Sequence, residues 1–163
     1  VLTSQIPGLT FANAMVLTAG ISLNEFEFPP SSGTNVIFDN GGPLMIDFST
    51  PITSLLVYVT YAEPFTIQIY DAASNVVGSA TSVFSSNLAL SGDPGSAPNE
   101  AFLLMFAGGF SSAVFMGNGA GESFTLDGLT FQSATNRIPE PSTLALALFA
   151  FAVLLRRCRR ARH

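Results

Sequence analysis

The sequence predicts an all-β domain, an antiparallel β-sandwich or jelly roll, followed by one short C-terminal transmembrane helix. Short runs rich in β-branched and aromatic residues recur between clusters of Gly, Pro, Asn and Ser, as strands do between turns. Before residue 136, no segment repeats its apolar residues at the period of an amphipathic helix. Eight or nine strands at this spacing are typical of a sandwich.

Nine runs qualify as strands. They lie at Thr10–Thr18, Asn35–Phe38, Pro43–Phe48, Ser54–Tyr61, Phe65–Asp71, Val76–Thr81, Ala101–Phe106, Ser112–Met116 and Ser123–Gln132. Apolar and polar residues alternate strictly from Phe65 to Tyr70, which is the period of a half-buried strand. The polar segment Asp71–Asn75 follows, so we predict a hairpin over Phe65–Thr81.

Three segments are predicted to be loops. Glu27–Thr34 contains two prolines, which remove backbone donors. Ser85–Glu100 is the longest connection, and a loop of that length in a compact domain is usually functional or mobile. Gly117–Gly121 forms a turn before the last strand.

The alternation of the last predicted strand breaks at Asp127–Gly128. The apolar residues on the two sides of this dipeptide have opposite parity, with Phe124 and Leu126 before it and Leu129 and Phe131 after it. One extra residue would return all four to one face, so we predict a β-bulge with Gly128 as its permissive residue. Asp127 is then either solvated at an edge or aimed at a loop or an ion.

The length and the charge distribution predict one acidic domain at residues 1–132, here called the body. The six Lys and Arg residues all lie at or after Arg137, whereas the segment before Arg137 holds ten acidic residues and a net charge of -10. Such a body offers nothing to phosphates, which excludes nucleic acid as a partner, and an anionic membrane surface would repel it. The chain begins with Val and shows no leader-like segment, so we expect a mature or truncated start from which any export signal is gone.

Missing residue types limit the chemistry of the body. It has no His, Cys or Trp, because the only His is His163 and the only Cys is Cys158. This excludes Ser-His-Asp and Cys-His nucleophile systems and the usual zinc ligands. Carboxylates, hydroxyls and hard cations remain. Most Asp and Glu residues are expected simply to be solvated.

Calcium is the one cofactor for which we state a hypothesis. The ligands would be Asp127, Glu25 and Glu27, provided that the fold brings these carboxylates together. Calcium binds through oxygen, and it would relieve the repulsion among carboxylates in a body without cations. No D-x-D-x-D-G loop is present.

The C-terminal residues have three parts in a fixed order. A linker at 133–142 contains Pro139, Glu140 and Pro141, which favour an extended, exposed segment. An apolar run at 143–155 predicts a helix of roughly 20 Å, short against a bilayer core of about 30 Å. A basic tail at 156–163 follows, and its charges are Arg156, Arg157, Arg159, Arg160 and Arg162. By the positive-inside rule the arginines stay cytoplasmic and the body is exported.

The order Ile138-Pro139-Glu140-Pro141-Ser142-Thr143, apolar helix and terminal Arg cluster resembles the PEP-CTERM sorting signal. The short apolar run and Cys158 depart from the pattern. The resemblance implies a Gram-negative bacterium that produces exopolysaccharide. It also implies that exosortase, a membrane cysteine transpeptidase, recognises the Pro-Glu-Pro region and removes the tail. The protein would be anchored in the inner membrane before processing and would then reach the cell surface or extracellular matrix.

The body resembles exported galactose-binding-like jelly-roll domains, some of which bind sugars or calcium. The matching segments are Pro29–Val36, Ile46–Phe48, Ile69–Ala72 and Phe124–Phe131. Without Trp, the polar aromatic faces open to a sugar would be those of Tyr58, Tyr61 and Tyr70.

Three classes of function remain open. The first is a non-catalytic exported surface or matrix protein associated with biofilm exopolysaccharide. The second is a carbohydrate-binding module of the cell envelope, which an exposed Tyr beside converging Asp and Asn residues would favour. The third is a carboxylate-based glycoside hydrolase, which needs two carboxylates facing each other across a cleft, about 5 to 9 Å apart.

The tail generates a processing prediction. Replacing Pro139, Glu140 and Pro141 by Ala should leave the full-length, membrane-held form in the native host, because the recognised extended segment is lost. Mass spectrometry of wild type and triple variant from membrane and medium fractions measures this. Trimming of the variant at the wild-type position would contradict the recognition of this motif.

Overall fold

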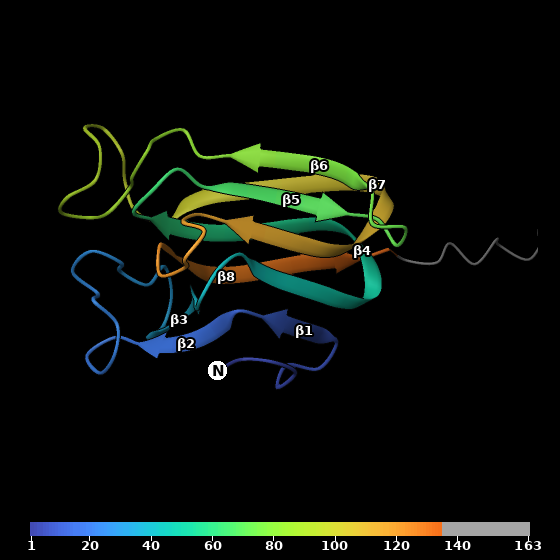
Figure 1. Cartoon of the computed structure of the whole chain (residues 1–163), viewed down its shortest axis with the longest axis horizontal. Helices are drawn as coiled ribbons and strands as arrows, with labels where there is room; N and C mark the ends of the chain where they lie inside the picture. The colour runs from blue at the N-terminus through green and yellow to red at the C-terminus, as the bar shows by residue number, and fades with distance from the viewer. Residues whose placement is uncertain (135–163) are drawn as a thin grey trace, which may run out of the picture.

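The computed structural model describes residues 1–134, and in them the all-β prediction is confirmed (Figure 1). No helix occurs in this part of the chain. Its eight strands are β1 (Leu9–Ala12), β2 (Ala14–Thr18), β3 (Asn35–Asp39), β4 (Leu44–Tyr61), β5 (Thr66–Tyr70), β6 (Val76–Thr81), β7 (Glu100–Met116) and β8 (Phe124–Ser133). All the strand pairings are antiparallel.

Two long strands, β4 and β7, pair with each other and build both layers of the fold. Their register slips twice near the middle. Six residues of β4 from Asp47 to Ile52 oppose three residues of β7 from Phe110 to Ser112, and a second slip lies between Ile52 and Ser54, which oppose Phe110 and Met105. Pro51 lies in the first slip, and Gly109, with a left-handed φ of 80°, lies on the β7 side of the second. Figure 1 shows both ribbons curling round at this end of the molecule. The two paired strands therefore pass together from one layer into the other.

The pairings define the composition of each layer. The first layer consists of β1, the first part of β4, the last part of β7, β5 and β6. The second layer consists of β2, β3, β8, the last part of β4 and the first part of β7. The arrangement is that of a β-sandwich whose two layers share two strands.

Aromatic side chains from both layers meet between them. The Phe65 ring, beside β5 of the first layer, lies 5.3 Å from the Phe102 ring and 4.9 Å from the Phe124 ring, which belong to the second layer. Tyr61 stacks on Phe65 with a centroid distance of 5.9 Å. Edge-to-face pairs of this kind add to the area term of burial and fix how the layers face each other.

The predicted strand Thr10–Thr18 is wrong, because the chain changes layer inside it. Asn13 adopts a left-handed φ of 54°, which ends β1 and begins β2. β1 then pairs with β4 in the first layer, whereas β2 pairs with β3 in the second. Asn is among the residues that tolerate this conformation best.

Two predicted breaks between strands are also wrong, because the structure has one continuous strand in each place. Pro43–Phe48 and Ser54–Tyr61 were expected as separate strands but belong to β4, and Ala101–Phe106 and Ser112–Met116 both belong to β7. Pro51 and Gly108–Gly109 look like strand ends in the sequence. In the structure they mark the bend between the layers, where proline and glycine are tolerated.

The predicted hairpin and the predicted bulge are both confirmed. β5 pairs with β6 around the turn at 71–75. In β8, four residues from Asp127 to Thr130 oppose three from Leu56 to Tyr58, and Gly128 has a φ of 59°. The predicted linker at 133–142, helix at 143–155 and basic tail at 156–163 lie mostly or wholly beyond the described residues. Within residues 1–134, no helix is long and apolar enough to cross a membrane.

The bulge yields a stability prediction. A Cβ at Gly128 would lie 2.7 Å from Cδ2 of Tyr58, whereas a Cβ at Gly33, which has nearly the same φ, would meet nothing within 4 Å. Both Gly→Ala changes carry the left-handed backbone cost of roughly 1–2 kcal/mol, but only Gly128→Ala adds a clash. Chemical denaturation should therefore show a clearly larger loss of unfolding free energy for Gly128→Ala. Equal losses would mean that Tyr58 gives way freely.

Candidate functional site

One row of side chains crosses the outer face of the first layer. The strand registers pair Thr10 with Asp47, Asp47 with Ser112, and Ser112 with Tyr70. These four residues, here called the polar row, have the opposite parity to the buried Ile46 and its neighbours, so they point away from the core. Directly opposed side chains of adjacent strands have Cβ atoms about 4.5–5.5 Å apart, so the row is continuous.

A second row lies beside it and is half apolar. Met45 pairs with Val114, and Val114 pairs with Gln68. The Tyr70 hydroxyl donates to Oε1 of Gln68 at 2.7 Å, which ties the two rows together and fixes the ring of Tyr70. All of these side chains except Thr10 are half-buried, and Thr10 is exposed. The face therefore combines an aromatic ring, a carboxylate, a hydroxyl and an amide with the apolar side chains of Met45 and Val114.

Within residues 1–134, this face offers hydrogen-bonding groups and few partners that could activate them. Asp47 has no His, Lys or Arg near it, because residues 1–134 contain none. Ser112 consequently has no general base of the usual kind to activate it. What the face offers is hydrogen-bond capacity beside an aromatic surface, the combination found in sites for uncharged polar ligands.

The carboxylate of Asp127 is aimed at a loop. Ser32 donates to it twice, from its backbone N–H to Oδ2 at 2.7 Å and from its hydroxyl to Oδ1 at 3.3 Å. The Gly128 N–H donates to Oδ1 at 2.6 Å. Of the alternatives open from the sequence, the bulge therefore directs Asp127 to the loop before β3, which it holds against β8.

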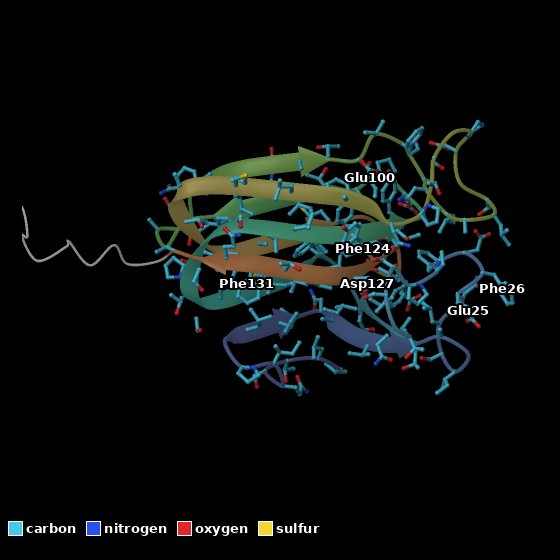
Figure 2. All side chains as sticks on the ribbon, turned by 180° about the vertical axis from the view of Figure 1, so that it is seen from behind. Glu25, Phe26, Glu100, Phe124, Asp127 and Phe131 are labelled. Carbon is cyan, nitrogen blue, oxygen red and sulfur yellow. The ribbon has the colours of Figure 1, made fainter. Side chains whose placement is uncertain are left out.

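Glu27 has a similar structural role. Its Oε2 accepts from the N–H groups of Leu90 at 3.0 Å and Ser91 at 3.2 Å, which joins the two long loops. The hydrogen bond from Leu90 is the main cause of the lowered pKa of Glu27. Figure 2 shows Glu25 on the loop at one end of the sandwich and Asp127 on β8.

Calcium binding remains a prediction. Within residues 1–134, no three His, Cys, Asp or Glu residues come together as a metal would need, so Glu25, Glu27 and Asp127 form no such group. The sorting residues Pro139, Glu140 and Pro141 and the arginines at 156–162 lie outside the described residues. Tyr61, predicted as a possible sugar-facing ring, is buried. Its hydroxyl donates to Glu100, and burial is the main cause that raises the pKa of Tyr61 to about 12.

Sequence reasoning missed a buried carboxylate at Asp39. It is fully buried and accepts from the Ser123 N–H at 2.9 Å, the Ser123 hydroxyl at 3.0 Å and the Phe124 N–H at 3.0 Å. Burial raises the pKa of Asp39, and the donors oppose that rise. The available signal was Asp39 itself, at the end of an apolar run and before Gly41–Gly42. Asp39 joins β3 to the start of β8.

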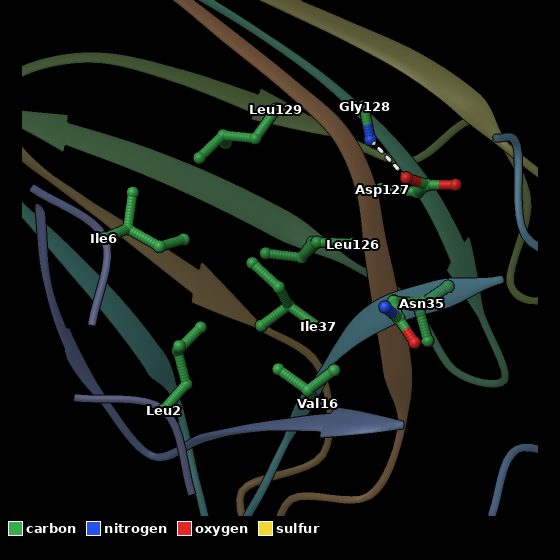
Figure 3. A pocket seen from close by; sticks show the side chains of 10 residues that line it. Leu2, Ile6, Val16, Asn35, Ile37, Leu126, Asp127, Gly128 and Leu129 are labelled. Atoms are coloured by element: carbon green, nitrogen blue, oxygen red, sulfur yellow. Dashed lines mark hydrogen bonds between the residues drawn. The ribbon is translucent and has the colours of Figure 1, made fainter. Parts of the chain in front are cut away.

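An apolar pocket of about 300 Å³ opens on the other side of the sandwich, between the N-terminal segment, β2, β3 and β8 (Figure 3). Its lining is mainly aliphatic, and it comprises Leu2, Ile6, Val16, Val36, Ile37, Leu126 and Leu129, with Asn35, Asp127 and Gly128 at one edge. Asp127 already has donors from the chain. The pocket therefore offers few free polar groups.

No family model and no curated protein matches this chain. Among solved structures, it is similar to the lectin-binding domain of lectinolysin (His 62 mutant) complexed with Lewis b, with 15% identity and a TM-score of 0.34, over 77% of this chain and 72% of that one. It is also similar to a family 11 carbohydrate-binding module from Clostridium thermocellum in complex with a β-1,3-1,4-mixed-linked tetrasaccharide. There the identity is 9% and the TM-score 0.37, over 79% and 91% of the two chains. These likenesses are too distant to assign a site.

Asp39 gives a prediction about stability. Asp39→Ala leaves the buried backbone donors of Ser123 and Phe124 without an acceptor, at about 1–3 kcal/mol for each donor. The unfolding free energy should fall by roughly 2–6 kcal/mol in urea titrations. Glu122→Ala, at an exposed position beside the same turn, is the control and should change it by less than about 0.5 kcal/mol. Equal effects would show that the Asp39 contacts contribute little.

Proposed function

We propose that the body is a non-catalytic carbohydrate-binding module. The observation that carries the proposal is the polar row, in which the ring of Tyr70 and the carboxylate of Asp47 share one face on either side of Ser112. A sugar has apolar C–H faces and a rim of hydroxyls. It needs an aromatic surface and hydrogen-bonding groups side by side, which this face supplies.

The geometry favours an extended glycan over a single sugar. Tyr70 and Asp47 stand on β5 and β4, with β7 between them. Two strand spacings amount to roughly 9–10 Å, so a ligand that contacts both must lie across the strands. Ser112 lies along that path and Gln68 lies beside Tyr70 on β5, and both side chains can donate and accept.

Catalysis finds less support than binding in the described part of the chain. A glycoside hydrolase of the usual kind needs two carboxylates about 5–9.5 Å apart across the scissile bond. Asp39 is the one acidic residue among the buried side chains of residues 1–134, and its oxygens accept from Ser123 and Phe124. The polar row holds the single carboxylate of Asp47.

A role in sorting and assembly complements this proposal. We propose that the protein is exported by a PEP-CTERM tail, processed by exosortase and retained at the cell surface or in the extracellular matrix, where the body contacts exopolysaccharide. The tail sequence from Ile138 to His163 supports the sorting part. A module that binds glycan gives the released protein a way to stay in such a matrix.

The binding proposal is tested by removing each half-exposed tyrosine in turn. Tyr70→Ala should weaken binding to the responsive polysaccharide by at least about tenfold, because a stacked ring loses more than about 1.4 kcal/mol of contact. Affinity electrophoresis of the full chain in detergent against a panel of soluble polysaccharides measures it. Tyr58→Ala is the matched control, since Tyr58 is equally half-buried but lies on β4 in the second layer.

Two outcomes would contradict the assignment. Binding lost in Tyr58→Ala and kept in Tyr70→Ala would place the site on the second layer. An absence of binding by wild type to every polysaccharide in the panel would remove carbohydrate binding as the function of the body.

A further inference from the structure

The carboxylate of Asp47 is not used by the fold. Seven of the ten acidic residues in the body accept hydrogen bonds from other parts of the chain. Asp47 accepts none from any side chain or backbone group of residues 1–134, although it lies in the middle of a strand. The other two without such a bond, Glu25 and Glu122, lie in loops at 19–34 and 117–123.

The neighbours of Asp47 leave its charge unbalanced. Thr10 and Ser112 flank it in the polar row, and neither carries a charge. Residues 1–134 contain no Lys, Arg or His that could pair with it. Within residues 1–134, the electrostatic field around the row comes from ten carboxylates and no cationic side chain, so the contribution of these residues is negative.

We propose that the polar row selects glycans that carry amino groups, and that it rejects acidic ones. This rests on the proposed carbohydrate-binding function and names its ligand class. An ammonium group near Asp47 would donate a charge-assisted hydrogen bond, the stronger kind, to a carboxylate with free lone pairs. A uronate or sulfate at the same place would meet like charge and no donor of positive sign.

The two positions fit a polymer of amino sugars. Asp47 and Tyr70 stand roughly 9–10 Å apart across β7, so one unit of a glycan chain can stack on Tyr70 while the ammonium group of another unit reaches Asp47. Selection then has two parts, which the structure separates by residue. Tyr70 gives affinity for any glycan, whereas Asp47 gives preference for the amine.

The experiment compares three hexasaccharides with one β-1,4-linked backbone. They are the glucosamine hexamer, the neutral glucose hexamer and the glucuronic acid hexamer. Calorimetric titrations use the full chain in detergent at low salt, near pH 6, where the amines are charged. We expect the glucosamine hexamer to bind about tenfold or more tighter than the neutral one, and the acidic hexamer not to bind. Half-molar sodium chloride should remove most of the preference, because it screens an exposed charge.

Variants assign the preference to Asp47. Asp47→Asn should reduce the ratio of glucosamine to glucose affinity to within about twofold of one. Asp47→Glu should restore part of it. Glu25→Gln removes the same charge from a loop and should leave the ratio unchanged. Melting temperatures confirm that each variant folds.

Each result decides something different. An equal fall in the ratio for Asp47→Asn and Glu25→Gln would overturn the role of Asp47, because the preference would then come from the diffuse field alone. Acidic hexamer bound as tightly as neutral hexamer, with or without millimolar calcium, would overturn the selectivity and leave carbohydrate binding standing. No binding of any hexamer or polysaccharide would overturn the proposed function itself.

Discussion

The fold depends on the continuous pairing of β4 with β7. Because these two strands run through both layers, their pairing determines both the core between the layers and the surfaces outside them. The slip between Asp47 and Ile52 turns the sheet over, and it lets Ile46 and Leu55 both face the interior from different layers. Without the slip, the second half of β4 could not return to cover the first. The polar row begins immediately before this bend, at Asp47, and so inherits its position from it.

The ten carboxylates of residues 1–134 have no basic side chain among those residues to pair with. Residues 1–134 contain no Lys or Arg, so their side chains cannot form ion pairs with one another. The carboxylates bind backbone N–H groups instead: Asp39 holds the start of β8, Asp71 closes the β5–β6 turn, and Glu27 joins two loops. Such charge-assisted bonds satisfy loop donors that no strand can reach. They also leave the carboxylates that lack such a role, Asp47 among them, open to a ligand.

Much of the fold was accessible from the sequence because the information was local. The period-two alternation predicted the β5–β6 hairpin, and the break in that alternation predicted the bulge at Asp127–Gly128. Local patterns failed where the answer depended on distant partners. Nothing adjacent to Asn13 shows that the chain changes layer there, and Pro51 resembles a strand end unless the pairing with β7 is known.

The candidate site was hidden for the same reason. Asp47, Ser112 and Tyr70 are far apart in the sequence, and only the registers of β4, β7 and β5 bring them into one row. Tyr70 could be named as an aromatic candidate, but its neighbours could not. Asp39 was missed because a carboxylate is expected at the surface, and its burial becomes tolerable only through donors more than eighty residues away at Ser123 and Phe124.

The two outer faces of the sandwich differ in a way that favours the first layer as the proposed glycan surface. On the second layer, β7 carries Leu103 and Met105 outward, 60% and 72% exposed, beside Leu56 of β4. Aliphatic side chains on an edge strand offer a sugar no hydrogen bonds, and the carboxylate on that side, Asp127, already accepts from Ser32. On the first layer, the apolar side chains of Met45 and Val114 lie beside the polar row, whose donors and acceptors are largely free. A ligand rich in hydroxyl and amino groups loses its hydrating water on binding, and the free polar groups of the first layer can replace those hydrogen bonds.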